Sequence, residues 1–205
     1  MKKIVTIALA AVMMLAGTSA FAQLSVGAGY LNSTLNKSYD GTALDPEASN
    51  GFYAGGSYNI NLFKGLGVAP GVYYSMLTGK SKTTYAGFTL TDHTFTEHAI
   101  NVPVNFNYGI DLRDVKFLVF AGPTFQYAIA SGYKGKVLNV DHSVDSFKDL
   151  DHNPFNIYLG GGLGAELAEK LQITVGFDYG LMNISKADKT VAHRYNIKLG
   201  VAYLF

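Results

Sequence analysis

Period-2 alternation at the end of the chain is the feature that most limits its fold. From Tyr195 to Phe205, every second side chain is apolar or aromatic, and the residues between are small or polar except Leu204. Such alternation predicts a β-strand with one apolar and one polar face. A strand of a soluble sandwich also alternates, so this strand alone does not decide the class of fold.

The same alternation recurs in seven further segments, which predicts an all-β chain. In the clearest of them, Ile100, Val102 and Val104 alternate with Asn101 and Pro103. Each segment is near the about 9–11 residues that a tilted membrane strand needs. The predicted strands are 24–32, 52–62, 66–76, 100–108, 117–127, 155–166, 171–181 and 195–205.

The connections between these strands alternate in length. Long connections are expected at 33–51, 77–98, 130–154 and 182–194, and short ones at 63–65, 109–116 and 167–170. Outer-membrane barrels have short periplasmic turns and long extracellular loops, whereas a soluble lipocalin-like barrel does not need this pattern. The sequence therefore predicts an eight-stranded antiparallel up-and-down transmembrane β-barrel with both termini in the periplasm.

The amino terminus has the features of an export signal. Lys2 and Lys3 precede an uncharged apolar run at 4–16, and Ala20-Phe21-Ala22 is a small-x-small cleavage site. An uncleaved anchor is the alternative, but the run is short for a span and lacks a positive stop-transfer flank. We expect a cleaved signal peptide at 1–22, a barrel domain at 23–205 and a location in the cell outer membrane.

Composition excludes several classes of function. Without Lys2 and Lys3, Lys+Arg falls from 16 to 14 against 15 acidic residues, a net charge of −1 that gives no reason to expect nucleic acid as a partner. The chain has no cysteine, so disulfides and thiolate chemistry are excluded. Charged residues make up only 15%, below the about 25% of typical soluble domains.

Three prolines fall inside predicted neighbouring strands, where they would each remove a backbone donor. Pro70, Pro103 and Pro123 belong to the third, fourth and fifth strands. A closed barrel has no edge strand for them, so we expect each at a bulge or near a strand end. A locally weakened seam in the barrel wall is the alternative.

Short motifs give the chain a family resemblance. The strand at 100–104 (Ile-Asn-Val-Pro-Val), Gly122-Pro123 and the glycine-rich 160–164 resemble strands of the PorT-like outer-membrane barrel family common in Bacteroidetes. The terminal Tyr203-Leu-Phe205 is similar to the carboxy-terminal signal read by barrel-assembly machinery. The resemblance implies an eight-stranded barrel without a cofactor, and it allows an accessory role in secretion.

The polar faces of the strands are expected to line the lumen. Eight strands enclose an interior just wide enough to be filled by side chains, so internal ion pairs and hydrogen bonds that plug the lumen are favoured over an open pore. Glu166 is a further candidate for this lining. The predicted polar lumen cluster is Asn101, Asn105, Gln126, Asp178, Arg194 and Lys198.

The residues that could carry other chemistry fall in the predicted loops. His93, His98, His142, His152 and His193 lie there with several acids, but no pair has a dedicated metal-ligand spacing, so no metal site is predicted.

Catalysis is not indicated either. The triplet at 141–143 (Asp-His-Ser) is adjacent in sequence, and adjacent strand residues point apart. The chain has no G-x-S-x-G motif, and no nucleotide-binding loop follows the glycines near Gly160. We therefore expect neither an enzyme nor a bound cofactor.

The predicted function is that of a small outer-membrane barrel with a plugged lumen and long extracellular loops, structural or mediating interactions at the cell surface. A secretion-system accessory component and an outer-membrane lipid-modifying enzyme are the alternatives. The expected partners are outer-membrane lipid, the barrel-assembly machinery through Tyr203 and Phe205, and an extracellular or envelope protein.

Overall fold

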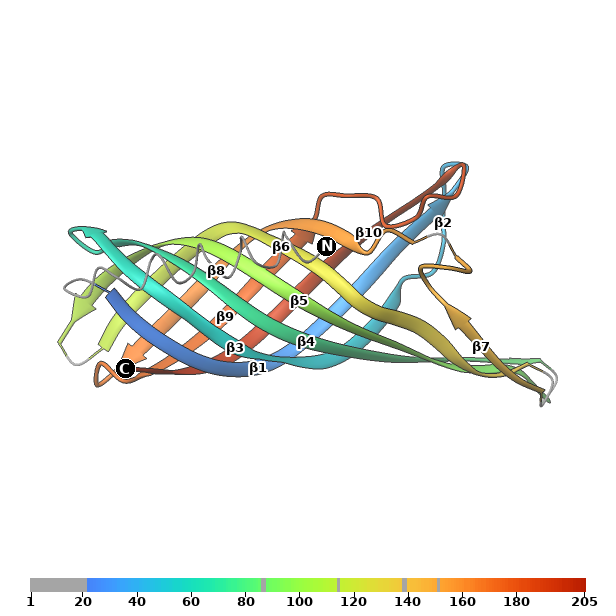
Figure 1. The fold of residues 1–205 in the computed structure, drawn as a ribbon, viewed down its shortest axis with the longest axis horizontal. Coiled ribbons are helices and arrows are strands. Elements are labelled where there is room, and N and C mark those ends of the chain that lie inside the picture. Colours follow the sequence, from blue (N-terminus) through green and yellow to red (C-terminus); the bar gives the residue numbers. More distant parts are fainter. Residues whose placement is uncertain (1–21, 86–87, 114, 138–139, 151) are drawn as a thin grey trace.

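Antiparallel strands make up almost all of the ordered chain. The computed structural model describes residues 22–85, 88–113, 115–137, 140–150 and 152–205, so the predicted signal segment lies outside the described residues except for Ala22. The described part contains no helix that could span a membrane. Its strands (Figure 1) are β1 (Ala22–Tyr39), β2 (Thr42–Ala43), β3 (Glu47–Phe63), β4 (Leu66–Tyr85), β5 (Phe88–Leu112), β6 (Val115–Val137), β7 (Val140–Asp145), β8 (Phe155–Leu167), β9 (Leu171–Gly180) and β10 (Thr190–Leu204).

Eight of these strands close into a barrel. They follow the order β10-β9-β8-β6-β5-β4-β3-β1, and β1 pairs with β10 from Ser25↔Leu204 to Tyr39↔Thr190. The two short strands are additions, because β2 pairs only with β1 and β7 only with β6. The predicted eight-stranded antiparallel up-and-down barrel is confirmed.

The outer wall of the barrel is apolar between two aromatic rims. In β10, Leu199 on the outside is 53% exposed, whereas the neighbouring Gly200 is buried inside. This is the band that a membrane barrel presents to lipid. The rim on the side of the long hairpins carries Tyr30, Phe52, Tyr74, Tyr127, Phe155 and Tyr179, and the opposite rim carries Phe63, Tyr108, Phe117, Tyr203 and Phe205.

The predicted long loops are wrong in most of their length, because strands continue through them. The segment 77–98 pairs as a hairpin from Thr78↔Thr96 to Tyr85↔Phe88, and 130–137 continues β6 alongside it. These strand ends extend to the right in Figure 1, away from the turns at 64–65, 113 and 168–170. In sequence, Thr78, Lys80 and Lys82 of β4 alternate with Gly79, Ser81 and Thr83, so neither parity of this part of the strand is apolar as lipid contact would require.

None of the three prolines sits at a bulge. Pro70 is the fifth residue of β4, whereas Pro103 and Pro123 lie well inside β5 and β6, contrary to the prediction of a bulge or a strand end. The β4–β5 ladder passes from Pro70↔Val104 to Tyr73↔Asn101 and the β5–β6 ladder from Pro103↔Thr124 to Phe106↔Ala121, each skipping two rungs without a change of register. Register shifts occur elsewhere, between Asn61 and Phe63, between Thr83 and Thr84, and between His98 and Ala99. A missing N–H interrupts a ladder without adding a residue, which explains the skipped rungs.

Aromatic side chains lie across strand glycines on the inner wall. Tyr53 of β3 covers Gly29 of β1 and Gly200 of β10, so a Cβ added to Gly200 would lie 2.1 Å from the Tyr53 hydroxyl oxygen. Phe120 of β6 covers Gly162 of β8 in the same way, at 2.6 Å from such a Cβ. Glycine at these positions lets large rings fill the narrow interior.

Candidate functional site

The interior of the barrel holds a cavity of about 160 Å³ between the short turns and the middle of the wall, lined by both polar and apolar side chains. Amides, hydroxyls and tyrosines from most strands of the ring line it. Among the predicted lumen residues, the lining includes Asn101, Asn105, Gln126, Asp178 and Lys198, together with Glu166. The inward direction predicted for these side chains is thus the one they have, and Arg194 lies outside this lining.

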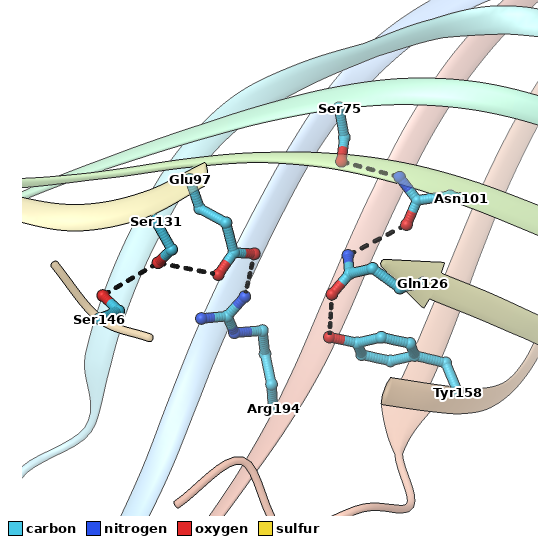
Figure 2. A network of polar contacts seen from close by, with 8 residues as sticks. All are labelled: Ser75, Glu97, Asn101, Gln126, Ser131, Ser146, Tyr158 and Arg194. Atoms are coloured by element: carbon cyan, nitrogen blue, oxygen red, sulfur yellow. Dashed lines mark hydrogen bonds and ion pairs between the residues drawn. The ribbon is translucent and has the colours of Figure 1, made fainter. Parts of the chain in front are cut away.

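A band of hydrogen bonds crosses four neighbouring strands at the end of the cavity that is nearer the long hairpins (Figure 2). The Asn101 amide Nδ2 donates to Ser75 Oγ at 2.8 Å, and Gln126 Nε2 donates to Asn101 Oδ1 at 3.0 Å. The buried Tyr158 hydroxyl donates to Gln126 Oε1 at 3.1 Å. Each donor and acceptor in the band fixes its neighbour, as buried polar groups require.

Ion pairs hold the charged residues of the cavity wall. Lys198 Nζ lies 2.5 Å from Asp178 Oδ2, joining β10 to β9. Lys116 Nζ lies 3.2 Å from Glu166 Oε2, and Gln172 Nε2 donates to Glu166 Oε1 at 3.2 Å. Both pairs join adjacent strands, so they brace the wall without crossing the lumen.

One ion pair does cross the lumen, on the side of the hydrogen-bonded band that is nearer the long hairpins (left in Figure 2). Arg194 Nη1 donates to Glu97 Oε1 at 2.5 Å, and their side chains are only 7% and 8% exposed. Glu97 is on β5 and Arg194 on β10, strands that lie opposite each other in the ring. Ser131 Oγ donates to the second Glu97 oxygen at 3.5 Å, and the Phe95 ring lies 5.8 Å from the guanidinium. The pair therefore spans the barrel where the wall meets the long hairpins.

Above this cross-lumen pair, further polar contacts fill the mouth. Lys37 Nζ lies 2.7 Å from Glu47 Oε1, and the Tyr133 hydroxyl donates to Glu47 Oε2 at 3.4 Å. Burial, and then the Glu47 carboxylate, raise the pKa of Tyr133 above its usual range. Burial, followed by the nearby cations of Lys37 and Arg194, lowers the pKa of His152. The surroundings of the mouth therefore favour the neutral forms of Tyr133 and His152.

The histidines do not gather at one place. His98 contacts Tyr74 on the outside of the wall at 2.5 Å, while His93 packs against Tyr133, with ring centroids 5.8 Å apart. The His193 imidazole bonds to the Gly180 carbonyl at 3.0 Å, and His142 lies on β7. Among the described residues, no group of three or more His, Cys, Asp or Glu side chains could hold a metal ion.

Sequence reasoning missed Glu97 as a lumen residue because it lay in a predicted loop. The signal was weak but present: Phe95, Glu97 and Ala99 continue the inward parity of β5, with a register shift between His98 and Ala99. Ser131 was missed for the same reason, because it lay in the predicted connection 130–154. Ser75 lay in the predicted strand 66–76 and was missed because a small hydroxyl residue gives little polarity contrast in a strand.

Comparisons with known proteins agree with this architecture. A family model described as outer membrane protein beta-barrel domain matches residues 18–186. The chain is similar to Ail, the attachment invasion locus protein of Yersinia pestis, solved in complex with the heparin analogue sucrose octasulfate: 18% identity, 90% of this chain, 99% of that chain and a TM-score of 0.52.

No curated protein sequence matches the chain. Other solved barrels are more distant than Ail. Neisserial surface protein A shares 16% identity over 90% of this chain and 99% of its own, with a TM-score of 0.46. OprG from Pseudomonas aeruginosa shares 11% identity over 91% and 96%, with a TM-score of 0.43. The chain thus belongs to the family of the outer membrane protein beta-barrel domain, and its place is the outer membrane of a Gram-negative cell.

Proposed function

We propose that this barrel does not conduct and that it acts through the sheet it presents outside the membrane. The observation that carries the proposal is the way the strands leave the barrel. Pairing of β3 with β4 ends at Asn50↔Thr78, but β4 continues with β5 to Tyr85↔Phe88. With the far ends of β6 and β7, these strands form a projecting four-stranded sheet.

A projecting sheet of this kind suits recognition better than transport. Exposed extensions held by a rigid scaffold are the usual site of binding in barrel and sandwich proteins. The cross-lumen pair of Glu97 and Arg194 supports the same proposal, because it occupies the path between the cavity and the projecting sheet. An envelope or extracellular protein is the class of partner that we expect.

The test is capture of partners from intact outer membranes by cross-linking. One variant replaces residues 82–92 by a two-residue Asn-Gly turn, which shortens the hairpin above the pair Ser81↔His93. The control variant replaces 186–189, in the β9–β10 connection, by glycine and serine. We expect a cross-linked partner to be lost only from the hairpin variant. Equal capture by both variants would refute a role for the sheet.

The resemblance to PorT-like barrels supports a second candidate, an accessory role in a secretion system. The motifs behind it lie in the wall at 100–104, 122–123 and 160–164, away from the projecting sheet. This role predicts capture of secretion-machinery subunits whether or not the hairpin is shortened. The same experiment therefore separates the two candidates.

We propose no catalytic role. Of the serines near the mouth, Ser33 Oγ is buried and has no hydrogen-bond partner among the described residues. Ser131 Oγ donates to Ser146 Oγ at 3.1 Å, and Glu97 Oε2 lies 3.5 Å from the same Ser131 oxygen. His152 approaches Ser146 through its backbone N–H, and within the described residues no hydrogen bond joins its imidazole to either serine. A lipid-modifying enzyme remains the alternative, and altered lipid A in a deletion strain would support it.

A further inference from the structure

The outer face of β4, β5 and β6 carries a row of cations and hydroxyls just above the apolar band. Lys80 of β4 pairs with Thr94 of β5, and Thr94 pairs with Lys134 of β6. All three side chains point outward, and both lysines are exposed. Two strand spacings separate the lysines, a distance of about 10 Å that one or two anionic groups can bridge.

The row below adds further hydroxyls to this face. Thr78 pairs with Thr96, and Thr96 pairs with Gly132, so Thr78 lies under Lys80, Thr96 under Thr94 and Gly132 under Lys134. Below them follow Met76 and His98, next to the aromatic rim. The face is therefore continuous with the surface that contacts lipid, and it becomes cationic with height.

Among the described side chains, the ion pairs do not include Lys80 or Lys134. In the row above, the register alternates lysine with aspartate, because Lys82 pairs with Asp92, Asp92 with Lys136 and Lys136 with Asp141. Asp145 of β7 pairs with Gly132 in the row below, and its carboxylate accepts the backbone N–H groups of Phe147 at 2.9 Å and Lys148 at 3.1 Å. The neighbouring strands β3 and β1 carry no cation in the row of Thr78. There Asn50 pairs with Thr78 and Asn32 pairs with Asn50, and the two amides bond to each other at 2.8 Å.

The height of the lysines above the band limits what they can meet. Lys80 lies six residues beyond Tyr74 at the rim, about 15 Å along the membrane normal for a tilted strand. The headgroup layer of an ordinary phospholipid is only about 5–7 Å deep. Even a lysine that bends toward the membrane therefore meets a headgroup that extends well above the glycerol level.

We propose that the face formed by Lys80, Thr94 and Lys134 binds the anionic saccharide headgroup of an outer-leaflet glycolipid. Its phosphate or carboxylate groups contact the lysines, and its sugar hydroxyls bond to Thr78 and Thr96. The acyl chains lie along the apolar wall of β4, β5 and β6. The site does not depend on the proposed protein partner, because it lies on the barrel wall below the tip of the sheet.

The test measures lipid retained by the purified barrel in nanodiscs, by native mass spectrometry. The nanodiscs contain a neutral phospholipid and a small fraction of one probe: a lipid bearing a bisphosphorylated disaccharide, its dephosphorylated form, or an ordinary anionic phospholipid. We expect preferential retention of the bisphosphorylated lipid. Lys80→Gln with Lys134→Gln should lower that retention about 30-fold, the factor for two lysines at an anionic surface.

The matched control is Lys148→Gln with Lys186→Gln, two exposed lysines on connections that lie off this face. It should retain the lipid like the wild type, and heat-modifiable mobility should show that both variants fold. Equal retention of the phosphorylated and dephosphorylated lipids would overturn the proposal, as would equal loss in the control. Displacement of the lipid by millimolar inorganic phosphate would also overturn it, because it would assign the face to free anions.

Discussion

Removing one partner of the cross-lumen ion pair should destabilise the barrel strongly. Arg194→Met leaves the Glu97 carboxylate buried and without its partner, and both groups are more than nine-tenths buried in the wild type. The free energy of unfolding should fall by about 3–5 kcal/mol, the cost of an uncompensated buried charge. Adding Glu97→Leu removes that charge and should restore most of the loss.

Urea unfolding in lipid vesicles, followed by heat-modifiable gel mobility and circular dichroism, measures these free energies. A loss below about 1 kcal/mol in the single variant, with additive behaviour in the double variant, would show that the pair is solvated. Planar-bilayer recording gives an independent result. The wild type should give no stable large conductance, and reproducible porin-like channels would refute the closed lumen.

Four further predictions concern other parts of the barrel. Leu199→Arg, near mid-bilayer, should cost about 2–4 kcal/mol, and unchanged stability would mean that this face does not meet lipid. Deleting Phe205 should lower the yield of folded protein in the outer membrane, measured by mobility on gels. Gly200→Ala should cost about 1–3 kcal/mol by clashing with Tyr53, and Tyr53→Phe should relieve part of that loss in denaturant unfolding. Folding lowers the pKa of His152, so the unfolded state binds a proton at this group more readily than the folded state. The free energy of unfolding should therefore fall as the pH drops below about 6.5, the ordinary pKa of histidine. Protease cleavage of the β7–β8 connection should become faster in acid, and His152→Gln should make that rate less dependent on pH.

The sequence was sufficient to predict the membrane-spanning wall of the barrel, but not the strand extensions that project from it. Alternation placed Leu199 and Val201 outside and Asn101 and Gln126 inside, because lipid on one side and a polar lumen on the other impose opposite polarities. Beyond the membrane no lipid imposes an apolar parity, and the mixed residues of 88–98 (Phe-Thr-Leu-Thr-Asp-His-Thr-Phe-Thr-Glu-His) were therefore assigned to a loop.

Partner choice inside the lumen was also out of reach. Strand parity gives the direction of a side chain, but the pairing of Glu97 with Arg194 depends on which strands face each other across the closed ring. The predicted lumen cluster named Arg194 and left out Glu97, which lay in the predicted connection 77–98. The need for glycine at Gly200 likewise could not be predicted from the sequence, because it depends on the ring of Tyr53 that lies across this position.

The pairing of β1 with β10 has a consequence for how the molecule forms. The two strands come from opposite ends of the chain, yet they share an uninterrupted ladder from Ser25↔Leu204 to Tyr39↔Thr190. Contacts so distant in sequence carry the largest loop-closure entropy, and they form late. Until the last strand arrives, both terminal strands expose open edges that invite pairing with another chain. The barrel can therefore close, and lose the edges that invite aggregation, only after its last strand has reached the membrane and paired with the first.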